Sequence, residues 1–168
     1  ADENLSATGE YTVEVTVHNT GDTAGKDVVQ LYYTPPYTQG GIEMASVNLL
    51  AFAKTDLIQP GESQTVTLTF DTYDLASYDY NDANGNQFSG YETVPGDYEI
   101  RLMKNSHTDG IMAENGESSF LLKSPGITFP QDPDTNAEVT NLFTGETAYA
   151  GTPIDGSTMI PSVWEFFI

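Results

Sequence analysis

The sequence of 168 residues contains no cysteine. This absence excludes disulfide bonds and thiolate metal sites. It leaves open whether the protein works in the bacterial cytoplasm or outside the cell, and we favour a location outside the cell. Histidine is also scarce, with only His18 and His107. Neither forms a His-x-x-x-His pair, so we expect both to be ordinary surface or packing residues and predict no transition-metal site.

Basic residues are few: 5 lysines and arginines stand against 25 acidic residues, which gives a formal net charge of −20. Such a chain repels nucleic acids and anionic membranes at long range, so neither is expected as a partner. The acidic residues are expected to form a solvated surface that keeps the protein soluble. An adaptation to salty surroundings, where screening weakens the repulsion, is the alternative.

Long hydrophobic runs are missing as well, and we therefore predict no transmembrane helix. No signal peptide is recognisable. Because Ala1 begins in the middle of a pattern, we expect the sequence to be part of a longer protein whose export signal, if it had one, is lost.

Short segments of β-strand pattern fill the first three quarters of the chain. Residues 11–18 alternate between apolar and polar side chains, and residues 28–34 are apolar on both sides, as in a central strand. In residues 47–70 an apolar run is followed by a Pro-Gly turn and a strictly alternating segment, which predicts a hairpin of two strands. Residues 96–104 and 117–123 alternate again.

These segments predict about seven short strands and no helix. We expect an all-β fold, an immunoglobulin-like or fibronectin type III-like antiparallel β-sandwich, over residues 1–123. Residues 1–9 are expected to be a frayed lead-in. Residues 124–168 are rich in Pro, Gly and Thr and predict an irregular extension or connector toward another domain.

The segment VNLLAFAKTDLIQPGESQTVTLTF at residues 47–70 resembles the fibronectin type III-like module of glycoside hydrolase family 3 enzymes, the β-glucosidases and their relatives. VTVHNTGDTAGKDVVQLYYTPP, DLASYD and GDYEIRL resemble other strands of that module, so that the resemblance covers residues 9–122. It implies a non-catalytic module that packs against the catalytic domains of the same polypeptide.

The extension contains TNLF at residues 140–143 and IDG at residues 154–156. These motifs resemble the connector of circularly permuted family members, in which the module precedes the catalytic barrel. The resemblance then implies that this sequence stops just before the barrel.

No catalytic residue is predicted. The nucleophile of the family lies in a Ser-Asp-Trp motif that this sequence lacks, since Val163 precedes the only tryptophan, Trp164. A retaining glycosidase also needs two carboxylates about 5 Å apart with different pKa values. Here the acidic residues are expected in solvated turns and on polar strand faces.

Three groups of residues are candidates for binding. The segment DYNDANGN offers clustered oxygens for a calcium ion, although Asp, Asn and Gly also suit an ordinary turn. No other cofactor is expected. Exposed tyrosines could stack on sugar rings, and the long loop at residues 35–46 is predicted to contact a neighbouring domain or the rim of an active site. The residues are Asp79, Asp82, Asn84 and Asn86 for calcium, Tyr80 and Tyr91 for carbohydrate, and Tyr37, Ile42 and Met44 for the domain contact.

The favoured interpretation is a structural accessory module of a family 3 glycoside hydrolase. The alternative is a free-standing extracellular module that binds a glycan or a protein partner. A calcium-stabilised spacer is a third hypothesis.

Overall fold

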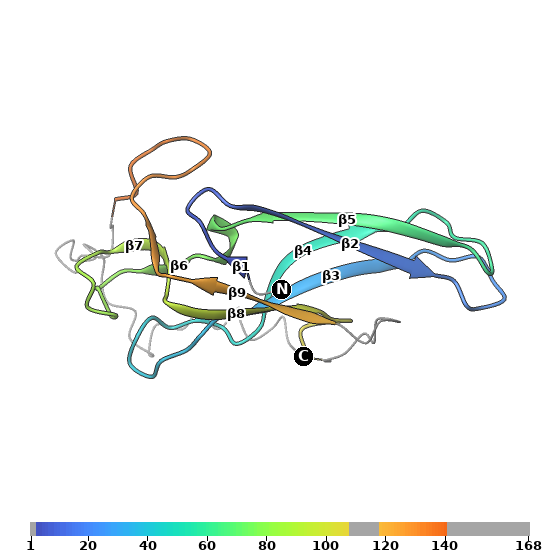
Figure 1. Ribbon diagram of the computed structural model, residues 1–168, viewed down its shortest axis with the longest axis horizontal. Helices are drawn as coiled ribbons and strands as arrows, with labels where there is room; N and C mark the ends of the chain where they lie inside the picture. The colour runs from blue at the N-terminus through green and yellow to red at the C-terminus, as the bar shows by residue number, and fades with distance from the viewer. Residues whose placement is uncertain (1–2, 108–117, 141–168) are drawn as a thin grey trace, which may run out of the picture.

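The computed structural model describes residues 3–107 and 118–140. Within these ranges it contains β-strands and one short 3-10 helix, so the predicted all-β fold is confirmed. The elements, shown in Figure 1, are β1 (Glu3–Asn4), β2 (Glu10–His18), β3 (Val28–Thr34), β4 (Asn48–Lys54), β5 (Ser63–Asp71), η1 (Tyr73–Leu75), β6 (Ser77–Asp79), β7 (Gly90–Thr93), β8 (Gly96–Leu102), β9 (Ser119–Ser124) and β10 (Ile127–Phe129).

Two layers enclose the main core. One layer is a five-stranded sheet in the order β1-β9-β8-β3-β4, and the other is the antiparallel pair β2-β5. Figure 1 shows this pair lying along β3 and β4. The inward side chains of both layers form one buried cluster: Leu5, Val29, Leu31, Tyr33, Val66, Leu68, Phe70, Leu75, Tyr98, Ile100 and Leu122.

The alternation along β2 and β5 determines which face of each strand is buried. Val66, Leu68 and Phe70 of β5 are buried, whereas the threonines between them are exposed. The outward threonines pair across the two strands, as the hydrogen bond of 2.9 Å between the hydroxyls of Thr16 and Thr65 shows. The prediction of a β5 strand buried on one face only is therefore confirmed.

The predicted hairpin at residues 47–70 is wrong, although both of its strands exist. β4 pairs with β3 in the five-stranded sheet, whereas β5 pairs with β2 in the opposite layer. The connection between them is held to the start of β3, because Thr55 accepts a hydrogen bond from the Asp27 N–H at 2.9 Å through its side chain. The period of two specifies the buried face of a strand but not its partner, and β5 covers the core only from the opposite layer.

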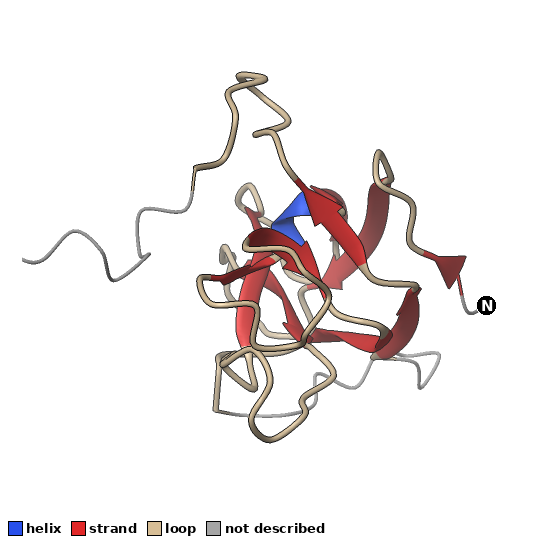
Figure 2. Ribbon diagram, turned by 90° about the vertical axis from the view of Figure 1, so that its left-hand side faces the viewer, coloured by secondary structure: helices blue, strands red, loops and turns tan. Residues whose placement is uncertain are grey.

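A smaller sheet lies at one end of the molecule, in the order β10-β7-β6. β7 pairs with β6 on one side and with β10 on the other, and β10 lies in the predicted extension. Figure 2, which looks at this end, shows loops gathered in front of the strands. The boundary after residue 123 stays a prediction, as does the structure of residues 141–168, which lie outside the described residues.

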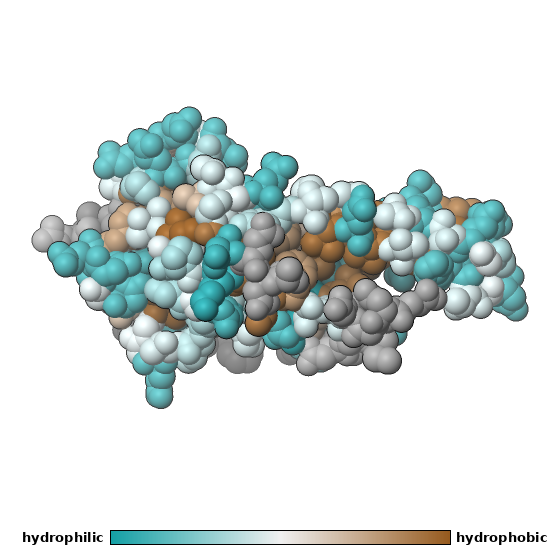
Figure 3. Space-filling model, in the orientation of Figure 1, coloured by the Kyte–Doolittle hydropathy of each residue, from teal (hydrophilic) through white to brown (hydrophobic). Residues whose placement is uncertain are grey.

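The N-terminal residues differ from the expected frayed lead-in. β1 pairs in parallel with β9, and Leu5 is buried in the main core. Figure 3 shows apolar side chains reaching the surface where β2 lies beside β3 and β4. Within the described ranges we find no helix with the length and apolarity that a membrane span requires.

Candidate functional site

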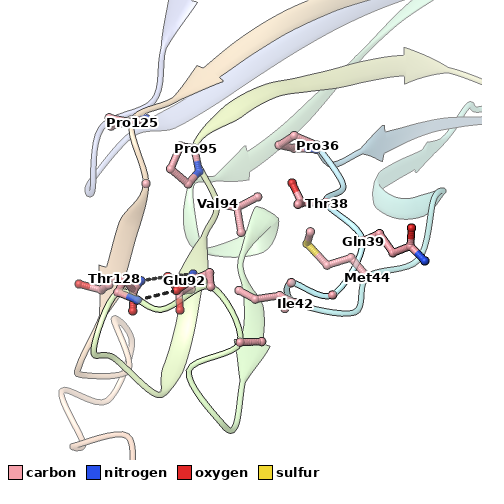
Figure 4. A pocket seen from close by; sticks show the side chains of 16 residues that line it. Pro36, Thr38, Gln39, Ile42, Met44, Glu92, Val94, Pro95, Pro125 and Thr128 are labelled. Atoms are coloured by element: carbon pink, nitrogen blue, oxygen red, sulfur yellow. Dashed lines mark hydrogen bonds between the residues drawn. The ribbon is translucent and has the colours of Figure 1, made fainter.

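A groove with a volume of about 620 Å³ lies beside the smaller sheet. Two loops and two turns contribute to it: the long loop at residues 35–46, the Asn-rich loop before β7, the turn between β7 and β8, and the turn between β9 and β10. Figure 4 shows Ile42 and Met44 on one wall and Glu92 and Thr128 on the opposite wall. The lining residues are Pro36, Thr38, Gln39, Gly40, Gly41, Ile42, Met44, Ala83, Asn84, Asn86, Glu92, Val94, Pro95, Pro125, Gly126 and Thr128.

Among the described residues that line the groove, Glu92 is the only titratable one. It lies in β7, is 2% exposed, and its Oε2 accepts hydrogen bonds from the side-chain amides of Asn84 (2.9 Å) and Asn86. Its Oε1 has no hydrogen-bond partner. Because a glycosidase requires two carboxylates, the described groove residues do not form an acid/base pair.

The environment of Glu92 favours its neutral form. Burial raises the pKa of Glu92 above its ordinary value of 4.5, the hydrogen bonds from Asn84 and Asn86 act in the opposite direction, and the charges of Asp79 and Asp82 raise the pKa further. Glu92 is not among the site residues that the sequence predicts. The alternation of residues 91–93 would have placed Glu92 opposite Tyr91, but no local signal indicated that this face of β7 is buried.

The predicted calcium ligands use their oxygens within their own loop. Asp79 is 1% exposed and accepts hydrogen bonds from the N–H groups of Asn81 (3.1 Å) and Ala83 (2.8 Å). Asp82, at a φ of 54°, accepts one from the N–H of Gln87 at 3.0 Å. Side-chain oxygens that accept from the backbone a few residues on are typical of Asx turns.

The amide oxygens of the other two predicted ligands behave in the same way. The oxygen of Asn84 accepts from the Asn86 N–H at 3.1 Å, and that of Asn86 accepts from the Phe88 N–H at 2.8 Å. In the part of the chain that the structure describes, no three acidic or histidine side chains are grouped to hold a metal ion. His18 and His107 are both exposed. The calcium site stays a prediction.

The tyrosines predicted to contact carbohydrate lie outside the lining of the groove. Tyr91 is in β7 on the face opposite to Glu92, and its ring packs edge to face with Tyr73 (5.4 Å) and Tyr78 (5.0 Å between centroids). Tyr80 is 54% exposed just after β6. Carbohydrate contact by these two residues stays a prediction, with Tyr80 more exposed to solvent than Tyr91.

The structure separates the three residues predicted for a domain contact. Ile42 is 4% exposed and Met44 is half-buried, and both line the groove. Tyr37 is 54% exposed outside the lining, and its hydroxyl donates a hydrogen bond to Glu43 at 3.2 Å. Ile42 therefore holds the loop to the domain, whereas Tyr37 is available to a neighbour.

Comparison with known proteins shows what part of this chain is similar to. Residues 27–106 match the family described as fibronectin type III-like domain. Beta-glucosidase A of Butyrivibrio fibrisolvens is 52% identical over 65 residues, which are 39% of this chain and 8% of that protein. The β-glucosidase of Ruminococcus albus is 37% identical over 99 residues, which are 56% of this chain and 10% of that protein.

A solved structure shows the same relation. β-Glucosidase 3B from Thermotoga neapolitana, determined in complex with glucose, matches with a TM-score of 0.55 and 30% identity, covering 71% of this chain and 14% of that chain. The chain thus spans only 8% to 10% of the length of these two curated relatives. Residues 27–106 are thus similar to a fibronectin type III-like domain, and the chain resembles short parts of much longer β-glucosidases.

Proposed function

We propose that this chain is the structural accessory module of a larger family 3 glycoside hydrolase, where it packs against the catalytic domains and stabilises them. The observation that carries the proposal is the position of the homologous domain within much longer β-glucosidase chains. The continuous core across both layers supports it, because such a core makes the module a rigid support. The groove supports it too, since its described lining lacks a pair of carboxylates.

The long loop at residues 35–46 is proposed to contribute to the substrate entrance. Its exposed Tyr37 is the residue that a sugar or a neighbouring domain would meet, while the buried Ile42 keeps the loop in place. We also propose the permuted order, in which the module precedes the catalytic barrel. Its support is the sequence resemblance of residues 140–143 and 154–156 to a connector.

The test compares the 168-residue chain with the complete polypeptide that carries it. We expect the complete polypeptide to hydrolyse an aryl β-glucoside and the chain alone to release no product above buffer. In the complete polypeptide, Tyr37→Ala is expected to raise KM without lowering the melting temperature. Hydrolysis by the chain alone, or a complete polypeptide without a catalytic domain, would contradict the proposal.

Glycan binding by the module itself is the second candidate, and the exposure of Tyr37 and Tyr80 favours it. Isothermal titration of the chain with cello- and xylo-oligosaccharides tests this function. Heat of binding that disappears in Tyr37→Ala or Tyr80→Ala would support a binding module. If millimolar oligosaccharide gives no heat of binding, glycan binding is contradicted and the structural role is the remaining candidate.

A further inference from the structure

We propose that the outer face of the five-stranded sheet is the surface by which this module docks on a neighbouring domain of the same polypeptide, an inference that rests on the proposed function. The outer face is the side of the sheet turned away from β2 and β5. The exposed apolar residues on it are Val28, Leu49, Phe52 and Leu121.

Strand register makes this face continuous from the β4 edge of the sheet inward. Phe52 of β4 lies opposite Gln30 of β3, and Leu49 lies opposite Tyr32, which in turn lies opposite Arg101 of β8. The bulge in β4 next to Leu50 brings Leu49 and Phe52 onto the same side.

The apolar residues of this face are exposed although strand residues of their type are normally covered. Phe52 is 68% exposed and Leu49 is 51% exposed, and neither belongs to the buried core cluster or packs against it. Phe52 lies in the middle of β4, and because its side chain is so exposed it does not contribute to the core. Contiguous exposed apolar side chains that are rimmed by polar ones are typical of interaction surfaces.

Charge also distinguishes this face from the rest of the molecule. Lys54 lies opposite Val28, Lys123 lies opposite Asp97, and Arg101 lies 3.9 Å from Glu99. Three of the five basic residues of the chain are therefore on this face, where they balance its acidic residues. A face without excess negative charge can approach another protein surface more easily than the remainder of this acidic molecule.

The occupant is a domain of the same polypeptide rather than a second copy of this chain. Two copies would bring net charges of −20 against each other, and that repulsion opposes a homodimer. The matching domain makes up only 14% of the solved relative, so the polypeptide there contains ample surface to cover such a face. An intramolecular contact also benefits from a high effective concentration.

The experiment uses Phe52→Gln with the matched control Thr69→Gln, an exposed position on the outward side of β5. Both variants are made in the 168-residue chain and in the complete polypeptide, and hydrogen exchange of the β4 amides is followed by mass spectrometry. In the chain alone, we expect both variants to keep the wild-type melting temperature and exchange. In the complete polypeptide, Phe52→Gln should speed exchange in β4 by about tenfold, and Thr69→Gln should leave it unchanged.

Each other outcome overturns the docking proposal. Equal β4 exchange in the wild-type chain and the wild-type complete polypeptide means that nothing covers the face. If Phe52→Gln lowers the melting temperature of the chain alone, the chain itself covers the face. If sedimentation shows a dimer of the chain that Phe52→Gln dissociates, a second copy covers the face. These failures leave the proposed function standing if the complete polypeptide hydrolyses the glucoside, whereas absent hydrolysis contradicts the proposed function itself.

Discussion

Tyr98→Phe removes one oxygen from the centre of the core. The Tyr98 side chain is fully buried, and its hydroxyl accepts a hydrogen bond from the backbone N–H of Val94 at 3.0 Å. Val94 lies in the turn between β7 and β8 and lines the groove. The hydroxyl therefore ties this turn, and the wall of the groove, to the main core.

The magnitude follows from the donor that the substitution leaves behind. Phenylalanine keeps the ring and its packing against Tyr33, whose centroid is 6.2 Å away, so no sizeable cavity forms. The Val94 N–H loses its acceptor in a partly buried position, and a buried donor without a partner costs roughly 1–3 kcal/mol. We expect Tyr98→Phe to lower the free energy of unfolding by about 2 kcal/mol, or the melting temperature by about 6 °C.

Urea unfolding followed by circular dichroism measures this effect, with the midpoint falling at an unchanged m-value. Tyr32→Phe is the matched control. Tyr32 is also buried as a residue, but its hydroxyl donates a hydrogen bond to the side-chain oxygen of Gln30 at 2.7 Å. Because Gln30 is half-buried and can turn to water, this loss should cost less than about 1 kcal/mol. Equal destabilisation by the two variants would refute the reasoning about Val94.

Three further predictions concern the core, the buried carboxylate and the Asn-rich loop. Leu68→Ala should lower the free energy of unfolding by roughly 2–5 kcal/mol, because Leu68 is 2% exposed between the layers, and a loss below about 1 kcal/mol in urea would contradict that packing. The pKa of Glu92 is higher in the folded protein than in the unfolded chain. The contribution of Glu92 to the free energy of unfolding is therefore fully present below the unfolded pKa near 4.5 and is lost as the pH rises through the folded pKa. The wild type should therefore lose stability relative to Glu92→Gln between pH 4.5 and neutrality, and urea midpoints that show no such trend would contradict the raised pKa. If the loop of Asp79 and Asn84 binds calcium, adding the ion at 100 times its Kd should raise the free energy of unfolding by about 2.7 kcal/mol over a chelated sample, and an unchanged melting temperature would exclude the site.

Much of the fold could be predicted because its signals are local. The alternation in β2 and β5 and the two-sided apolar pattern of β3 specify strands and their buried faces, since side chains in a strand point to opposite sides in turn. Partner choice is not local, and therefore the hairpin prediction for β4 and β5 failed. Short elements such as β1 and β10 also have too few residues to show a period.

The sequence by itself determined the all-β class, the excess of acidic residues and the buried faces of β3 and β5. Only the tertiary structure decided which strands pair, that the acidic Glu92 is buried with one oxygen unpartnered, and that Phe52 and Leu49 remain exposed on the outer face of their sheet. The physical reason is that burial depends on what the other layer and distant loops cover. Residues 35–46 and 80–90 both contribute to the groove beside β7, and no period along the chain indicates that these two segments share a site.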